Sequence, residues 1–600
     1  MNRTTPTIVP AVTSLIAILV IPLAVGDLRA TGLNLTECQT NPDQPARPRV
    51  LSGAPPVPTD PPALMADAIW YQVFVSRFRN GDPANDPPDA APWTTDWFRL
   101  LDGEKPPLRD RLFGRRHGGD LRGVIESIGY FQSLGINTLY LNPIFSAPSQ
   151  HKYDTADHRH IDDTFGVPGA ADRHADETLD PATWSLSDSD RVFLELLRRC
   201  HAAGIRVVID GVFNHVGRRF FAWQDVLANG PKSRYANWFD VTDWGPPIRY
   251  NAWDRPDGHL VEFRRDNDGL DPGVEAYIFA VTRRWMDPDG DGDPSDGVDG
   301  WRLDVAEKPP QGFWRRFRRV VKTVNPDAAI VGEIWPDATR WLQGDQFDAV
   351  TNYRFREPVI RLIGRARRLG TPTRFARDLD QLFTDHPPAV IRSMMNLLDS
   401  HDTGRAVTVL AMDSSIENQS ATRPPDDPAI GRLKLAALLQ FTLPGAPVIY
   451  YGDEIGMYGG NDPQCRAPMW WTDRATPGGN GALRAYYQRL CRLRRQHAAL
   501  RRGMFRWMLL DDRSRVVAFH RRADDDQLVV VLNLGDHRRP IELNVATPAT
   551  AHAVLLCNVN GDPGEGSVPI VASGGMLSCV LPGRSAVVLS LVKMCTKQDN

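Results

Sequence analysis

The chain has 600 residues, with 70 basic and 73 acidic side chains and a net charge of −3 at pH 7. Hydrophobic residues make up 42% of the chain and charged residues 24%, which is typical of a soluble globular protein with more than one domain. Nucleic-acid binding depends on a clustered basic surface, so this near-neutral balance excludes nucleic acid as the main partner.

The first 26 residues predict a signal peptide. Arg3 supplies a positive start, residues 8–25 are almost free of charge, and small residues follow at 24–26. This pattern predicts an exported protein, periplasmic or extracellular, that keeps no membrane span after cleavage. An uncleaved membrane anchor is the alternative, because the apolar run is long. Residues 27–66 are rich in Pro, Thr and Asp and predict a tether.

Eight short apolar runs of strand length follow, with helical stretches between most of them. The runs are 69–75, 138–141, 206–209, 298–303, 330–334, 347–350, 391–397 and 448–451. Eight strands alternating with helices predict an α/β fold, a (β/α)8 TIM barrel over residues 67–502. Long excursions follow the first three strands, and the excursion at 216–273 predicts a small insertion domain.

After residue 503 the helical pattern stops. Strand-like segments separated by turn residues predict a C-terminal antiparallel β-sandwich over residues 503–595. The seven cysteines are an odd number spread thinly along the chain, which argues against a disulfide framework. Cys557 and Cys579 lie in neighbouring strand-like segments. They could form a disulfide or remain two isolated thiols, and the sequence leaves both alternatives open.

Polar residues stand where the predicted barrel strands end: Asn142, Asp210, Asp304, Glu333, His401 and Asp402. In a barrel these ends meet on one face, where the loops build the site. Arg302 lies two residues before Asp304 on one strand, so the two side chains point to the same face.

Six segments, in this order, resemble the signature regions of the α-amylase superfamily. They are Gly119-Asp-Leu-Arg-Gly123, Asp210-Gly-Val-Phe-Asn-His215, Gly300-Trp-Arg-Leu-Asp304, Gly332-Glu-Ile-Trp335, Ser400-His-Asp402 and Gly445-Ala-Pro-Val-Ile-Tyr-Tyr-Gly-Asp-Glu454. The resemblance spans the predicted barrel. It implies an enzyme that cleaves α-glucosidic bonds with retention of configuration.

The resemblance also assigns roles. It implies Asp304 as the nucleophile, Glu333 as the acid/base, and Asp402 as the carboxylate that grips ring hydroxyls of the distorted sugar. His215 and His401 would donate hydrogen bonds to the sugar in the first donor subsite. We expect the charge of Arg302 to keep Asp304 ionised, and crowding by carboxylates to favour a proton on Glu333. Helix capping by the three carboxylates is the competing interpretation.

Four further segments narrow the resemblance to the neopullulanase, cyclomaltodextrinase and maltogenic amylase branch. They are Ser149-Gln-His-Lys-Tyr-Asp154, His160-Ile-Asp-Asp-Thr-Phe-Gly166, Phe347-Asp-Ala-Val-Thr-Asn-Tyr353 and Gly459-Gly-Asn-Asp-Pro-Gln-Cys-Arg466. The resemblance implies that Tyr153 stacks on the glucose whose bond is cut, that Asp462 and Arg466 bind the next glucose, and that His151 also contacts substrate. It implies that Trp335 lines the acceptor side, where core packing is the competing role.

Two stretches predict Ca²⁺ sites. The resemblance implies one site at Asn80, Asp82, Asn85, Asp86, Gly118 and Asp120, whose oxygen ligands suit a hard cation. The second stretch, Asp287, Asp289, Asp291 and Asp293, has the spacing of the first half of an EF-hand loop. Its twelfth position is Val298 where that loop requires a bidentate Glu, so the pattern is incomplete. A polar turn is the alternative at either place.

These features together predict a calcium-binding, retaining α-glucan hydrolase that cleaves α-1,4 bonds in starch, maltodextrins, pullulan or cyclodextrins. Whether it also cleaves α-1,6 bonds stays open. A glucan transglycosylase, an oligosaccharide α-glucosidase and a non-catalytic glucan-binding protein are the alternatives. Residues 27–66 are too short to be the N-terminal β-sandwich with which this branch dimerises, so the oligomeric state stays open. Glu307 and Lys308 stand where many α-amylases carry Lys-His, which leaves acceptor preference open.

Overall fold

The computed structural model describes residues 59–170, 174, 176–365, 370–412, 424–472, 479–545, 549–558, 570–573 and 575–593. The predicted signal peptide and the tether up to residue 58 lie outside these residues. Among the described residues, no helix combines the length and the hydropathy needed to cross a lipid bilayer.

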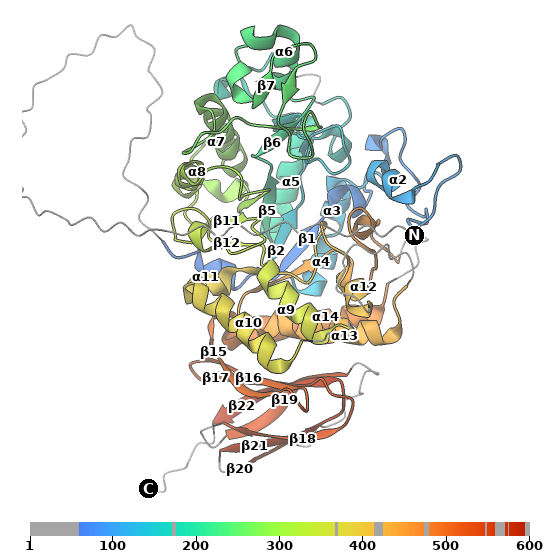
Figure 1. Ribbon diagram of the computed structural model, residues 1–600, viewed down its shortest axis with the longest axis vertical. Helices are drawn as coiled ribbons and strands as arrows, with labels where there is room; N and C mark the ends of the chain where they lie inside the picture. Colours follow the sequence, from blue (N-terminus) through green and yellow to red (C-terminus); the bar gives the residue numbers. More distant parts are fainter. Residues whose placement is uncertain are drawn as a thin grey trace, which may run out of the picture. The chain divides into compact units, whose positions relative to one another are not determined.

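Eight parallel strands form one sheet, in the order β12-β11-β10-β5-β2-β1-β14-β13. Figure 1 labels five of them, β1, β2, β5, β11 and β12. The eight strands are β1 (Trp70–Val73), β2 (Thr138–Leu141), β5 (Arg206–Gly211), β10 (Gly300–Leu303), β11 (Ala329–Gly332), β12 (Ala349–Val350), β13 (Met395–Asn396) and β14 (Ala446–Tyr450). A parallel bridge between Thr351 and Met395 joins the two outer strands. The sheet therefore closes, and the predicted (β/α)8 barrel is confirmed.

Helices cover the outside of the barrel because each presents one apolar stripe to the strands. In α8 (Gln311–Val324), Phe313, Phe317 and Val321 follow helical spacing and are fully buried. A capping box at Ser187 starts α5 (Asp188–Ala202). The other helices of the barrel are α3 (Leu121–Glu126), α4 (Ile128–Leu134), α7 (Pro272–Met286), α9 (Tyr353–Ile363), α10 (Pro372–Asp385), α11 (Pro388–Ser393), α12 (Ala406–Ala411), α13 (Asp427–Thr442), α14 (Gly481–Gln496) and α15 (Ala498–Arg502).

Two predicted boundaries are wrong. Residues 59–66 are not part of a tether, because they contain α1 (Ala63–Ala66) and Met65 is buried in the barrel core with Trp70 and Val208. The predicted strand at 391–397 is shorter, because α11 occupies its first residues and only β13 follows. Proline at the start of α11 pre-sets the helical backbone angle there.

The three long excursions rise from the carboxyl ends of β1, β2 and β5. The first contains α2 (Leu108–Gly114), and the second contains β3 (Phe145–Ser146) and β4 (Asp157–Ile161). The third, green in Figure 1, contains β6 (His215–Gly217), α6 (Phe221–Asn229), β7 (Val241–Asp243), β8 (Arg249–Tyr250) and β9 (Leu260–Glu262). Phe220, Trp223, Phe239 and Phe263 pack as an aromatic cluster that holds this excursion together.

The C-terminal part consists of two antiparallel sheets, as predicted. One has the order β15-β16-β17-β22-β19 and the other β18-β21-β20. Their strands are β15 (Met504–Asp511), β16 (Val516–Ala523), β17 (Asp526–Asn533), β18 (Arg539–Asn544), β19 (Ala549–Asn558), β20 (Ile570–Ser573), β21 (Met576–Leu581) and β22 (Ser585–Lys593). The buried Arg521 donates to the carbonyls of Thr442 and Leu500 and so ties β16 to the barrel helices. Cys579 is a buried free thiol.

Candidate active site

Three carboxylates predicted from the sequence gather at one end of the barrel. Asp304 directly follows β10, Glu333 follows β11, and Asp402 lies in the loop after β13. All three line one cavity of about 430 Å³. The barrel brings them together because the carboxyl ends of its parallel strands share one face.

The guanidinium of Arg302 connects the carboxylates. Its Nη1 donates to Asp210 at 2.8 Å and to Asp304 Oδ1 at 3.1 Å, and its Nη2 lies 2.9 Å from Glu333 Oε2. Arg302 is fully buried, and the two strands that carry Arg302 and Asp210 pair directly, with the two residues opposite each other. The Arg302 guanidinium therefore sets the positions of three acidic groups, because its planar fork of N–H donors can serve several carboxylates at once.

Arg302 alone does not set the ionisation of Asp304. Burial raises the pKa of Asp304 well above its usual range, Arg302 lowers it, and the neighbouring Glu333 and Asp210 raise it further. Arg302 thus lowers the pKa of Asp304, as expected, but burial raises this pKa by more. In the free protein the carboxylate cluster takes up a proton more readily than an isolated aspartate does.

Glu333 has two more contacts besides Arg302. The backbone N–H of Val305 donates to its Oε2 at 3.1 Å, and Trp335 Nε1 donates to its Oε1 at 3.0 Å. Val305, whose N–H makes this contact, has a φ of +46°, a strained conformation for a β-branched residue. Trp335 is 44% exposed and stacks on Tyr353, with ring centroids 3.8 Å apart. Trp335 is therefore a wall of the cavity and not a core residue.

Asp402 is flanked by His401 on one side. Gln72 Nε2 lies 2.9 Å from His401 Nδ1, and because an amide N–H can only donate, Nδ1 must accept. The ring proton is then on Nε2, which lies 3.0 Å from Asp402 Oδ2 and 2.7 Å from the hydroxyl of Tyr153. Burial holds the pKa of His401 well below its usual value, helped by Arg466, so the ring is a neutral donor.

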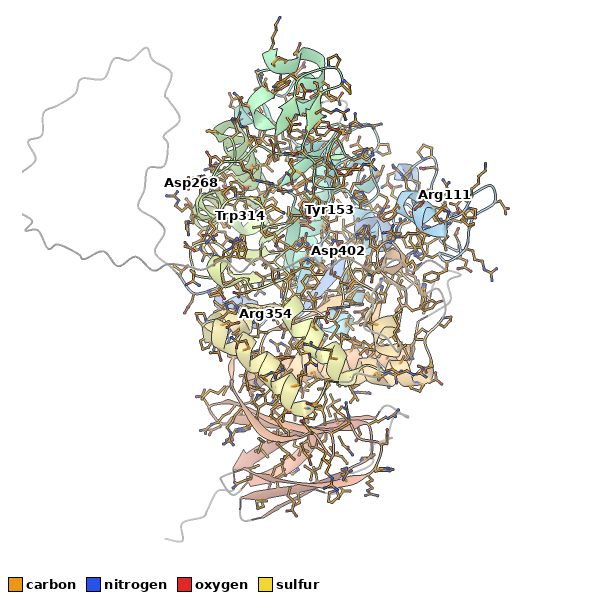
Figure 2. The ribbon with its side chains drawn as sticks, in the orientation of Figure 1. Arg111, Tyr153, Asp268, Trp314, Arg354 and Asp402 are labelled. Atoms are coloured by element: carbon orange, nitrogen blue, oxygen red, sulfur yellow. The ribbon has the colours of Figure 1, made fainter. Side chains whose placement is uncertain are left out.

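Tyr153 and Asp402, both labelled in Figure 2, belong to this hydrogen-bonded set. The Tyr153 hydroxyl donates to Asp210 Oδ2 at 2.9 Å, and its ring lies parallel to the ring of His401, with centroids 5.4 Å apart. Arg466 donates to Asp402 Oδ1 at 3.1 Å and its Nε lies 2.9 Å from Asp462 Oδ1. The predicted donor-side residues therefore lie next to one another.

The two remaining predicted histidines also line the cavity. Burial lowers the pKa of His215 to about 4 and that of His151 to about 3, so both rings are neutral at pH 7. His215 Nε2 lies 4.0 Å from Asp304 Oδ2. A neutral imidazole at this position can donate to a sugar hydroxyl without adding charge.

Sequence patterns missed several residues of the cavity wall. Phe113 of α2, Leu260 of β9, and Trp253, which precedes β9, line the cavity together with the predicted residues. Trp253 is 40% exposed, and the ammonium of Lys308 lies 5.3 Å from its ring centre. These residues belong to long excursions that have no helical or strand periodicity. The sequence pattern therefore does not predict which of their side chains line the cavity.

The residues of the first predicted Ca²⁺ site lie together. Asp120 caps α3 and accepts N–H groups from Gly81, Asp82 and Gly123, while Asn80 donates to Asp86 at 2.6 Å. Burial raises the pKa of Asp120 to about 6.

Two observations show that a cation fits there. Asn85 Oδ1 is buried and accepts no hydrogen bond from the described residues. Gly118 has a φ of +71°, and a Cβ at this position would lie 1.9 Å from Asp86 Oδ1. The set offers oxygen ligands around a small space, which fits Ca²⁺.

The second predicted Ca²⁺ set is only partly assembled. Carboxylate oxygens of Asp287, Asp289 and Asp296 lie within 4.8 Å of one another, whereas Asp291 and Asp293 are not in this group. Asp293 instead caps the turn at Pro294–Asp296 by accepting the N–H of Ser295. Asp296, which the EF-hand spacing did not select, joins because that turn folds back onto the start of the loop.

Comparison with known proteins agrees with this geometry. Residues 72–179 and 188–503 match the family described as alpha amylase, catalytic domain, and residues 507–592 match alpha amylase, C-terminal all-beta domain. Neopullulanase 2 of Thermoactinomyces vulgaris is 39% identical over 491 residues, which are 81% of this chain and 72% of that protein. The solved structure of cyclic alpha-maltosyl-(1-->6)-maltose hydrolase from Arthrobacter globiformis superposes with a TM-score of 0.68 at 30% identity, covering 89% of this chain and 100% of that one.

The comparisons correct the predicted localisation. A relative from Bacillus subtilis, 35% identical over 81% of this chain and 72% of its own length, is named intracellular maltogenic amylase. The expectation of export from an apolar, charge-poor N-terminal stretch is therefore wrong, since composition alone does not distinguish a secretory leader from other apolar segments. The matches to both domains and the carboxylate cluster agree: the chain belongs to the α-amylase family of glycoside hydrolases, in the branch of neopullulanases, cyclomaltodextrinases and maltogenic amylases.

Proposed function

We propose that the protein hydrolyses α-1,4 and α-1,6 glucosidic bonds of maltodextrins, starch, pullulan and cyclodextrins with retention of configuration. The observation that carries the proposal is the pair Asp304 and Glu333 on Arg302, with Asp402 lining the same cavity at the carboxyl end of the barrel. Two carboxyl groups on one guanidinium are close neighbours, which suits the short separation of a retaining enzyme.

In the first step Asp304 attacks the anomeric carbon. Its Oδ1 is held by Arg302, which leaves Oδ2, on the His215 side, as the attacking oxygen. Glu333 donates its proton to the glycosidic oxygen, and the bond between this oxygen and the anomeric carbon breaks. The product is a glycosyl ester on Asp304 and a free leaving sugar.

In the second step water replaces the leaving sugar. The Glu333 carboxylate takes a proton from this water, whose oxygen attacks the anomeric carbon and releases Asp304. Asp402, oriented by Arg466 and by the N–H of His401, holds ring hydroxyls in the distorted sugar. Trp335 provides an aromatic face for the leaving sugar on the acceptor side.

Digestion of pullulan, β-cyclodextrin and soluble starch by the purified chain in Ca²⁺ buffer tests the proposal. We expect reducing sugars from all three substrates, with the α-anomer formed first in NMR spectra of the products. Release of longer oligosaccharides at high substrate concentration would favour the transglycosylase. No reducing sugar from any of the three substrates would overturn the proposal.

Arg302→Lys is expected to lower kcat/KM by about 10²–10³ and to move the acid limb of the pH profile to higher pH. A lysine ammonium cannot bridge three carboxylates, so positioning is lost. Arg302 lowers the pKa of Asp304, hence a weaker contact lets that pKa rise further. Because the nucleophile must be ionised, activity is then lost at a higher pH as the pH falls. The pH dependence of kcat/KM checks this, and an unchanged acid limb would contradict it.

We also propose that the site at Asn80, Asp82, Asn85, Asp86, Gly118 and Asp120 binds Ca²⁺. A cation there would keep Asp120 ionised and tie the first excursion to α3. Removal of Ca²⁺ by a chelator is expected to lower Tm by a few degrees, since a ligand at about 100 times its Kd adds about 2.7 kcal/mol.

Gly118→Ala should abolish this Ca²⁺-dependent rise in Tm, because the new Cβ occupies the space beside Asp86. Gly129→Ala in α4 is the matched control, since its Cβ meets nothing within 4 Å. Differential scanning calorimetry with and without Ca²⁺ gives the result. An equal Ca²⁺-dependent rise in the Gly118→Ala variant would refute the assignment.

A further inference from the structure

A second cavity, of about 530 Å³, lies between the excursions that follow β2 and β5. It is lined by His160 of β4, by His174 and Glu177 from the segment between β4 and α5, and by Tyr235 of the β5 excursion. None of these residues lines the active-site cavity. The carboxylate chemistry described above does not use this cluster.

Two imidazoles and one carboxylate converge there. One ligand atom each from His160, His174 and Glu177 lies within 4.8 Å of the others. His160 Nε2 is 2.9 Å from Glu177 Oε2, and His174 Nδ1 is 3.3 Å from Glu177 Oε1. The two rings lie 4.5 Å apart and are tilted by 32°. Tetrahedral Zn²⁺ holds ligand atoms about 3.3 Å from one another, so small side-chain shifts complete the geometry.

His160 is placed between two carboxylates. Its Nδ1 lies 2.8 Å from Asp190 Oδ2, and its Nε2 faces Glu177. A neutral ring carries one N–H, which can serve only one of them. The other nitrogen then directs a lone pair at a carboxylate oxygen, an arrangement that needs a cation between the two atoms. That cation is either a proton or a metal ion.

Neighbouring side chains hold the ligands in place, and His174 Nδ1 lies 2.9 Å from Ser185 Oγ. Asp190 sits in the capping box of α5 and is fully buried, so it holds the His160 ring by its Nδ1 and leaves Nε2 to bind. Glu177 Oε1 accepts the backbone N–H of Ser185 at 2.8 Å, which leaves Oε2 facing His160. Two arginines lie near the cluster. Arg159 forms its closer contacts with Asp157, at 2.6–3.1 Å, and stands 3.6 Å from Glu177, and Arg284 Nη2 lies 3.2 Å from Asp190 Oδ2.

We propose that His160, His174 and Glu177 bind a divalent transition-metal ion, Zn²⁺ in the first instance, with a water molecule from the adjoining cavity as fourth ligand. Two imidazoles and a carboxylate are a typical Zn²⁺ ligand set. The ion ties the segment before α5 to β4. The site is separate from the glucan site and from the oxygen-only Ca²⁺ site.

The test uses the full chain, stripped with a chelator and then kept in excess Ca²⁺ so that Ca²⁺ sites stay filled. Calorimetric titration with Zn²⁺ is expected to give one equivalent per chain, and Co²⁺ is expected to give the visible absorption of a tetrahedral ion. His174→Ala removes a half-buried ligand without disturbing the barrel. It should weaken Zn²⁺ binding at least tenfold and abolish the Co²⁺ spectrum, as should Glu177→Gln.

His201→Gln is the matched control, because His201 binds Asp299 and is not in the cluster. It should bind Zn²⁺ like the wild type. Starch hydrolysis by His174→Ala should remain unchanged, which separates this proposal from the proposed function. The proposal is overturned if the wild-type chain binds no stoichiometric Zn²⁺, in which case a proton is the cation at His160. It is also overturned if His174→Ala binds Zn²⁺ as tightly as the wild type does.

Discussion

Replacing Asp304 by asparagine is expected to reduce kcat on maltodextrins by at least about 10⁴ while leaving the fold intact. The amide cannot form the glycosyl ester, so the first step has no nucleophile. The same change removes one of the acidic groups around Arg302, where burial already disfavours the charged form of Asp304. We therefore expect Tm to stay within about 3 °C of the wild-type value or to rise.

Asp299→Asn is the matched control for this variant. Asp299 precedes β10 at the opposite end of the strand, where it accepts hydrogen bonds from His201 and the backbone of Val207. Residues at that face of a barrel serve stability and not chemistry. Its kcat should stay close to wild type. Near-normal turnover by Asp304→Asn, measured by release of reducing sugar, would exclude Asp304 as the nucleophile.

Replacing Glu333 by glutamine is expected to lower kcat on maltodextrins by about 10²–10⁴, the range that general acid catalysis contributes. Glutamine cannot donate a proton to the glycosidic oxygen. Fluoride needs no such proton to leave, so α-maltosyl fluoride should still form the glycosyl ester in this variant. The loss should therefore be much smaller in the first turnover with the fluoride than with maltodextrin.

The contrast between the two variants separates the two roles. Asp304→Asn should fail with both substrates, whereas Glu333→Gln should show a burst of fluoride release, because its second step lacks the base. Stopped-flow measurement of fluoride release gives the answer. Equal losses of Glu333→Gln on maltodextrin and on maltosyl fluoride would assign Glu333 a positioning role and leave the acid unidentified.

The sequence by itself determined the barrel, the C-terminal sheets and the carboxylates. Alternating strand-length runs and helical stretches reflect local preferences, which a chain expresses within a few residues. Asp304 and Glu333 could be located because each directly follows a strand, and strand ends share a face in any parallel barrel. The short motifs around them carried the family resemblance.

The tertiary structure alone decided the contacts between distant segments. Three features depend on packing between elements. Arg302 joins Asp210, Asp304 and Glu333, Trp335 forms an exposed wall, and Phe113 and Trp253 reach the cavity from distant loops. Loop length and side-chain shape determine such contacts, so the periodicity of the sequence does not predict them.

The cation clusters show the same division. Local spacing selected Asp291 and Asp293, but the turn at Pro294–Asp296 brings Asp296 to Asp287 and Asp289 in their place. No sequence spacing links His160 and His174, and they meet because the segment before α5 folds back over β4. When a loop folds back to bring ligands together, tertiary packing decides which residues meet. When the residues lie at strand ends, the sequence pattern already predicts that they meet.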